Sequence, residues 1–128
     1  MGAHSKRKGN VYERQTATWY RGLGIECKRG WQSREGCDDP DVVLENFSWP
    51  NRLWIECKHH KKPPSAFAAM KQAQEAMEKA EVSLVQMPVC HLHQSHGEHL
   101  VVITRGDWGR IIGALESEQE RRQPAGGE

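Results

Sequence analysis

The chain has 128 residues, of which 37% are hydrophobic and 27% charged, and its net charge is +1. This length fits one domain with a small hydrophobic core. No apolar run reaches the roughly 18 residues that a membrane span needs, and the basic start lacks the apolar core of a signal peptide. The four cysteines form no CxxC pair, which favours reduced thiols and a cytoplasmic location.

The charges are unevenly distributed along the chain. Residues 1–34 sum to +6, residues 35–57 to −5, residues 58–71 to +4 and residues 72–128 to −4. Two basic stretches on either side of an acidic one are typical of a phosphate-binding surface around a carboxylate site. Ordinary surface charge gives the same pattern, so both interpretations stand at this point.

Residues 1–10 are basic and lack large apolar side chains, which predicts a flexible arm. The domain itself is predicted at 11–115, and a disordered tail at 116–128, where the apolar residues end. Periodicity and turn residues predict a helix, three strands, a helix, two strands and a helix, at 11–22, 24–28, 41–47, 52–58, 66–80, 81–90, 99–104 and 108–115. Helices mixed with strand hairpins indicate a small α/β layer fold.

The segment PDVVLENFSWPNRLWIECK, at 40–58, is predicted to form a β-hairpin with its turn in SWPN. Side chains alternate between the two faces of a strand. With the turn centred directly before Trp49, Asp41 faces Glu56; a shift of two residues pairs Asp41 with Lys58 and keeps the same faces. A slip of one residue is disfavoured, because it would mix the apolar and charged faces.

Either register gathers two carboxylates and one ammonium group on one face of the hairpin. Opposed like charges are unfavourable unless something positive lies between them. Mg²⁺ is typically held by one or two carboxylates together with a substrate phosphate. A neighbouring lysine can orient or help deprotonate a water molecule, so the pattern suits phosphodiester hydrolysis. The alternative is that these residues form the solvated side of an edge hairpin.

The dipeptide P-D at 40–41, followed by E-C-K at 56–58, resembles the motif of the PD-(D/E)xK nuclease superfamily. Over roughly residues 5–115 the order of segments is similar to that of its archaeal and phage-type Holliday-junction resolvases. The shared order is a basic arm, a helix with an early glutamate, a strand, a loop with Ser, Gly and Arg, the hairpin, a helix, two strands and a helix. The resemblance implies a restriction-endonuclease-like α/β fold, with a central mixed β-sheet flanked by helices.

Residue by residue, the resemblance implies that Asp41 and Glu56 bind the metal together with the backbone carbonyl of Cys57. Lys58 would position the attacking water, and Glu13 would approach the metal from the first helix. The implied cofactor is Mg²⁺, which Mn²⁺ can replace. The candidate DNA-binding residues are Lys6, Arg7, Lys8, Arg29, Ser33, Arg34, Lys61, Lys62 and Lys71.

The implied function is that of a metal-dependent, structure-selective DNA endonuclease, which resolves four-way (Holliday) junctions by paired symmetric nicks in a bacterial, archaeal or phage-infected cell. Paired nicks require two sites related by a two-fold axis, which predicts a homodimer. Its predicted interface is apolar, at Val101, Ile103, Trp108, Ile111 and Ile112. The alternatives are a restriction-like or nicking endonuclease acting on duplex DNA, and a catalytically idle DNA-binding module of the same fold.

A histidine-rich segment at 90–99 does not belong to this motif. It contains Cys90, His91, His93, His96 and His99. Cysteine and histidine are zinc ligands, but zinc sites usually join paired ligands from different parts of a fold. The segment is therefore interpreted either as a solvated hairpin loop or as a weak zinc site.

Overall fold

The computed structural model describes residues 3–30, 39–60, 62 and 64–123, and side chains from Asn10 onward. Its helices and strands follow the predicted order. They are α1 (Ala3–Gly22), β1 (Cys27–Arg29), β2 (Val42–Leu44), β3 (Arg52–His60), α2 (Ala66–Lys79), β4 (Gln86–Gln94), β5 (His99–Val102) and α3 (Arg105–Arg122). α2 and α3 each begin with an N-cap, because Ser65 Oγ accepts from the amide of Ala68, and Thr104 Oγ1 from the amide of Asp107.

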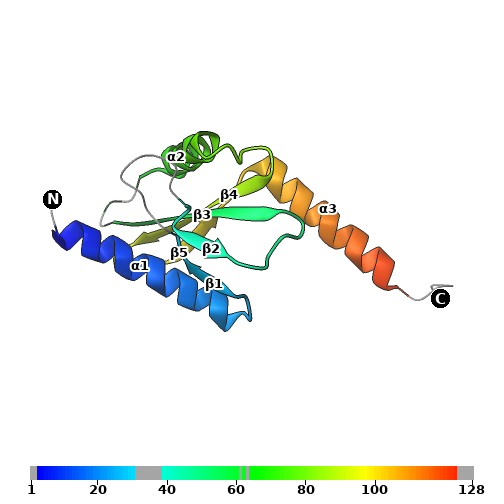
Figure 1. Ribbon diagram of the computed structural model, residues 1–128, viewed down its shortest axis with the longest axis horizontal. Helices are drawn as coiled ribbons and strands as arrows, with labels where there is room; N and C mark the ends of the chain where they lie inside the picture. The colour runs from blue at the N-terminus through cyan, green and yellow to red at the C-terminus, as the bar shows by residue number, and fades with distance from the viewer. Residues whose placement is uncertain (1–2, 31–38, 61, 63, 124–128) are drawn as a thin grey trace.

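The strands lie in the sheet in the order β1-β2-β3-β4-β5 (Figure 1). β3 and β4 are parallel, and the other neighbours are antiparallel. The parallel pair requires a crossover, which α2 supplies. The expectation of a central mixed sheet flanked by helices is therefore confirmed, and β3, which carries E-C-K, is its middle strand.

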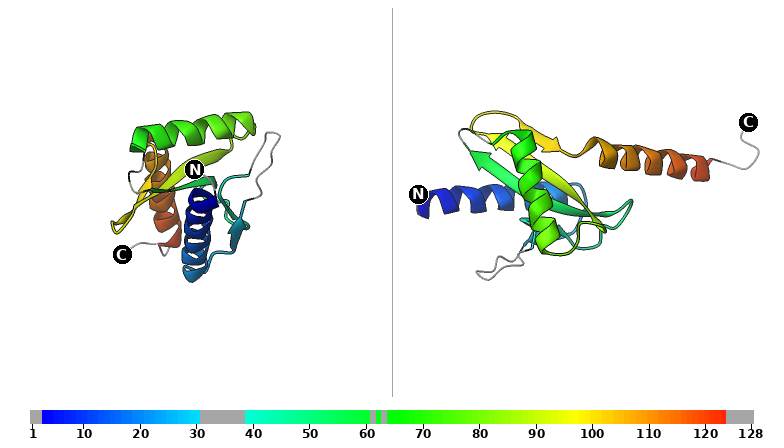
Figure 2. Two further views of the ribbon diagram at one scale, coloured as in Figure 1. Left: turned by 90° about the vertical axis from the view of Figure 1, so that its left-hand side faces the viewer. Right: turned by 90° about the horizontal axis from the view of Figure 1, so that it is seen from above.

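Two hydrophobic clusters hold the helices against opposite faces of the sheet (Figure 2). On the α1 side, Val42, Leu44 and Ile55 pack with Ala17 and Tyr20. On the α2 side, the cluster consists of Trp54, Ala69, Met70, Ala73, Met77, Cys90 and Leu92. Because side chains alternate along β3, Leu53, Ile55 and Cys57 point towards α1, whereas Trp54, Glu56 and Lys58 point towards α2.

Both ends of the chain are more helical than the sequence suggested. α1 begins at Ala3, within the segment expected to be an arm, and its first turns hold good helix formers, Ala, Lys and Arg, without proline. α3 continues to Arg122, well into the segment expected to be disordered. Its last turns need no apolar residues, because Glu118 forms ion pairs with Arg121 and Arg122 at helical spacing.

The fourth strand is displaced from its expected place. It was predicted at 81–90 from the apolar run around Val85, but β4 spans Gln86–Gln94, and Leu84 before it is 95% exposed. Nine residues of β4 pair in parallel with β3, from Arg52 with Gln86 onward. This register extends the strand through the first histidines of the expected hairpin loop and leaves only a short turn before β5.

Candidate active site

Of the two hairpin registers that the sequence left open, β2 and β3 have the one that pairs Asp41 with Glu56. Val42 pairs with Ile55, which places Asp41 opposite Glu56. The Asp41 carboxylate links the two strands, because its Oδ2 accepts a hydrogen bond of 2.8 Å from the backbone amide of Cys57. The apolar partners Val42 and Ile55 are fully buried, so a slip in register would expose them, and this holds the two carboxylates together.

Glu56 is the most strongly perturbed carboxylate of the described residues. Burial, the negative charge of Asp41 and a hydrogen bond with Asp41 together raise the pKa of Glu56 to about 8. Two groups oppose this rise: Trp54, whose Nε1 donates a 2.7 Å hydrogen bond to Glu56 Oε1, and the positive charge of Lys58. Without a cation, Glu56 therefore favours its protonated form at neutral pH. A bound metal ion could take the place of this proton between the two carboxylates.

Glu13 reaches the same region from α1. Burial and the charge of Asp41 raise the pKa of Glu13. Arg29 on β1 opposes this shift, because its Nη2 lies 3.2 Å from Glu13 Oε1 and also donates to Asn10 Oδ1 at 2.8 Å. The expected approach of Glu13 towards the hairpin carboxylates is thus consistent with the structure, while Arg29, expected to contact DNA, is engaged by α1.

Lys58 completes the set. It is half-buried on β3, and it points to the same side of the sheet as Glu56. The Cys57 side chain between them faces α1, and burial raises the pKa of its thiol well above the ordinary value. The Cys57 thiol is therefore no candidate ligand, and only its backbone carbonyl can serve as one.

The donor set fits a hard cation bound through few protein ligands. Asp41 and Glu56 supply oxygen, which Mg²⁺ prefers, and Mg²⁺ usually keeps several waters beside one or two carboxylates. Among the residues that the structure describes, no group of three or more His, Cys, Asp or Glu side chains is arranged to hold a metal ion. Glu13 therefore does not belong to a preformed ligand cluster while it is paired with Arg29.

The remaining DNA-binding candidates are only partly described. Lys62 and Lys71 are exposed, Lys62 before α2 and Lys71 on it. Three candidates lie outside the described residues, namely Ser33, Arg34 and Lys61. Lys6, Arg7 and Lys8 lie in α1, but their side chains are outside the described set.

The expected solvated loop is only partly present, because His96 lies in the exposed turn between β4 and β5, whereas His91 and His93 belong to β4 and His99 to β5. Within the described part of the chain, no three of these side chains are arranged as a zinc site. His91 is buried, and its Nε2 lies 2.7 Å from the Tyr20 hydroxyl. His93 lies 2.7 Å from His59, Nδ1 to Nδ1, and stacks on His99 with ring centroids 3.8 Å apart. The sequence signal for this arrangement was the period-two spacing of His91, His93 and, across the turn, His99.

Neither a scan against models of protein families nor searches of curated proteins and solved structures found a match for this chain. In the described part of the chain, no helix combines the length and the apolar character that crossing a bilayer requires. The carboxylate hairpin therefore remains the strongest indicator of function in this molecule.

Proposed function

We propose that this protein is a Mg²⁺-dependent DNA endonuclease of the PD-(D/E)xK type that cuts four-way junctions. The observation that carries the proposal is the pairing of Asp41 opposite Glu56 across a buried hairpin, with Lys58 on the same side. The order of helices and strands supports it, because it is the order that the resemblance implies. Glu13 adds a third carboxylate from a separate element, close enough for Asp41 to shift its pKa.

Asp41 and Glu56 would hold the Mg²⁺, which neutralises charge on the scissile phosphate and makes a water more acidic. Glu56 must lose its proton to act as a ligand, and Lys58 already favours the ionised form of Glu56. Lys58 would also orient the attacking water. The water oxygen then forms a bond to phosphorus, one P–O ester bond breaks, and the proton of the water ends on solvent or the leaving oxygen.

The homodimer that paired nicks require is supported by the exposed surface of α3. None of its residues, Arg105 to Arg122, is buried, and the helix projects away from the sheet (Figures 1 and 2). Trp108, Ile112 and Leu115 are each between 44% and 53% exposed, and their spacing places them on one side of the helix. An isolated amphipathic helix gains its stability from packing, so we propose that a second copy covers this side.

The test is cleavage of labelled four-way junctions and of matched linear duplexes in Mg²⁺ or Mn²⁺. Asp41→Asn and Lys58→Ala should lower the cleavage rate by about 100-fold or more while leaving junction binding intact. Glu75→Gln, at an exposed carboxylate on α2, serves as the matched control and should cut like the wild type.

The products separate the alternatives. Symmetric paired nicks on the junction alone support the proposal. Cutting of both DNAs indicates a general or restriction-like nuclease, whereas binding without cutting in either metal indicates an idle DNA-binding module. Undiminished cutting by Asp41→Asn would show that the site lies elsewhere.

A further inference from the structure

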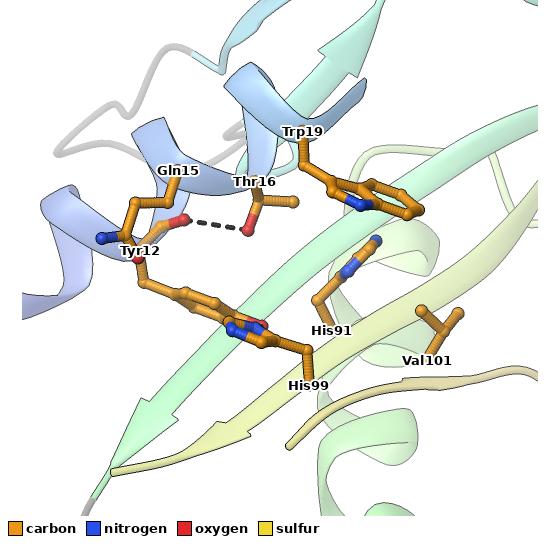
Figure 3. A pocket seen from close by; sticks show the side chains of 7 residues that line it. All are labelled: Tyr12, Gln15, Thr16, Trp19, His91, His99 and Val101. Atoms are coloured by element: carbon orange, nitrogen blue, oxygen red, sulfur yellow. Dashed lines mark hydrogen bonds between the residues drawn. The ribbon is translucent and has the colours of Figure 1, made fainter. Parts of the chain in front are cut away.

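A pocket of about 500 Å³ opens on the α1 side of the sheet, beyond the area that α1 covers (Figure 3). This volume lies within the range of ligand sites, about 300–1,000 Å³. One face of α1 forms one wall, and β4 and β5 form the other. The lining residues are Tyr12, Gln15, Thr16, Trp19, His91, His99 and Val101.

Flat rings make up most of this lining. Tyr12 and His99 stack with an interplanar angle of 24°, and Trp19 meets His91 edge to face with ring centroids 5.9 Å apart. Trp19 is 53% exposed although it borders the pocket, so much of its indole surface remains open to a ligand. Figure 3 shows Trp19 at one side of the pocket and the Tyr12–His99 pair at the other, with His91 between them.

The polar groups in the pocket are neutral. No lysine, arginine or carboxylate is among the described lining residues. Burial lowers the pKa of His91 to about 4, so its ring is uncharged at neutral pH. Gln15 offers both a donor and an acceptor, and the Trp19 indole offers a donor. Such a site suits an uncharged planar ring with polar edges and gives no reason to bind a phosphate or a carboxylate.

The pocket lies on the α1 side of the sheet, near the end of β3 that carries E-C-K. Tyr12 lines the pocket and directly precedes Glu13. His59, which follows Lys58, lies 5.4 Å from Tyr12 between ring centroids. Trp19 lies six residues beyond Glu13 on the same helix, a rise of about 9 Å. Lys58 points to the α2 side, so a DNA strand with its phosphate there would have to pass the end of β3 to place a neighbouring base at Trp19 on the α1 side.

We propose that this pocket holds one unpaired base of the DNA substrate, stacked against Trp19; the inference rests on the proposed function for its choice of ligand. Stacking of a base on an aromatic side chain tolerates any sequence, because every base has a π-face. The pocket would then select DNA in which a base is free to leave the helix, as it is near a branch point, over continuous duplex. A pocket that binds a base mainly by stacking selects the structure of the DNA more than its sequence.

The test compares two end-labelled DNAs without divalent cations, so that nothing is cut. One carries a single unpaired 2-aminopurine, and the other is fully paired. Stacking contributes about 1–3 kcal/mol per base, so Trp19→Ala should weaken binding of the first DNA by about 5- to 150-fold and leave binding of the second unchanged. The emission of 2-aminopurine should be quenched by the wild type and not by the variant.

Two further variants keep the test decisive. Phe67→Ala removes an aromatic ring that is 88% exposed on α2, outside the pocket, and should bind both DNAs like the wild type. Val101→Trp places a bulky ring at the pocket edge on β5, at a side chain that is 54% exposed, and should weaken binding of the unpaired base even if Trp19→Ala fails to fold. Circular dichroism checks the fold of each.

Three results would overturn the inference: equal affinity of wild type and Trp19→Ala for the unpaired base, an equal loss on fully paired DNA, or a shift of Trp19→Ala to monomer without loss of base binding. The last would assign the pocket to a second copy of the chain. The two proposals fail separately. Junction cutting that does not depend on Trp19 would contradict only the proposal of base binding in the pocket. Trp19-dependent base binding without cutting in Mg²⁺ would contradict only the proposal of nuclease activity.

Discussion

The chemistry of the candidate site depends on how close two carboxylates are held. Asp41 is fixed by the amide of Cys57, and Glu56 is fixed by the indole of Trp54. Their proximity and the burial of Glu56 make its ionised form unfavourable without a cation. Without a metal ion, ionising Glu56 beside Asp41 costs free energy. This cost should make the stability of the folded protein depend on pH.

The folded-state pKa of Glu56 is raised from 4.5 to about 8, so between these values the folded protein holds a proton that the unfolded chain has lost. The free energy of unfolding should therefore fall as the pH rises through this range. His91, whose pKa is lowered from 6.5 to about 4, acts in the opposite direction below pH 6.5. The decline expected from Glu56 is followed from pH 6.5 to 8, where the opposing contribution of His91 fades; Glu13, whose pKa is also raised, acts in the same direction as Glu56.

Urea denaturation across that window, without divalent cations, should show a decline for the wild type and a flatter profile for Glu56→Gln. Glu75→Gln on α2 is the control and should keep the wild-type decline. An unchanged decline in Glu56→Gln would mean that another group titrates there. Addition of Mg²⁺ should stabilise the wild type more at pH 8 than at pH 6.5, because the ligand must be ionised to bind.

At the scale of elements, the sequence predicted the two faces of the hairpin well, because its apolar and charged residues alternate consistently along both strands. Val42, Leu44 and Ile55 define one face and the turn composition locates the bend, which leaves two registers with the same faces. The structure has the register with Asp41 opposite Glu56. Where the pattern of apolar residues was ambiguous, the predicted strand and the observed strand differ in position. The apolar run around Val85 resembles a strand, but parallel pairing with β3 fixed β4 further along the chain.

Of the candidate site, only the residues within one hairpin could be predicted from the sequence. Asp41, Glu56 and Lys58 lie within one hairpin, where period-two spacing determines their side. The Glu13–Arg29 ion pair and the Trp54–Glu56 hydrogen bond depend on how α1 and neighbouring side chains pack, and no local pattern encodes that. The pocket between α1 and β5 was likewise invisible, because it joins residues separated by nearly the whole domain.

α3 offers a direct test at this scale. A Cβ added at Gly109 meets no atom within 4 Å, and the same holds for Gly24. Gly109 lies within the helix, where glycine is less stable than alanine by about 0.5–1 kcal/mol, so Gly109→Ala should raise the free energy of unfolding by that amount. Gly24, after α1, has φ +86°, so Gly24→Ala should lower it by about 1–2 kcal/mol.

Chemical denaturation of the two variants beside the wild type measures both effects. Since neither Cβ meets a neighbour, the contrast isolates backbone conformation from packing. A loss of stability in Gly109→Ala would mean that another surface packs closely against the glycine side of α3. That side differs from the side of Trp108, so such a result would relocate the proposed dimer contact.

At the scale of the whole molecule, the proposed function requires two copies, and α3 is the element on which they are expected to meet. Trp108 is 53% exposed and shares a helix side with Ile112 and Leu115. A charge buried in an apolar interface carries a large desolvation cost, so Trp108→Glu should convert dimers to monomers, as measured by sedimentation velocity. Its carboxylate, placed in the N-terminal half of α3, should leave the monomer folded.

The same variant connects assembly with activity. If each copy carries a complete site at Asp41, Glu56 and Lys58, monomers should still nick a junction, but the two nicks should become independent events. On a supercoiled plasmid that extrudes a four-way junction, the wild type should give linear product directly, because both nicks occur before it dissociates. Trp108→Glu should accumulate nicked circles first. Direct linear product from a variant that sediments as a monomer would contradict the coupling of paired nicks to dimerisation.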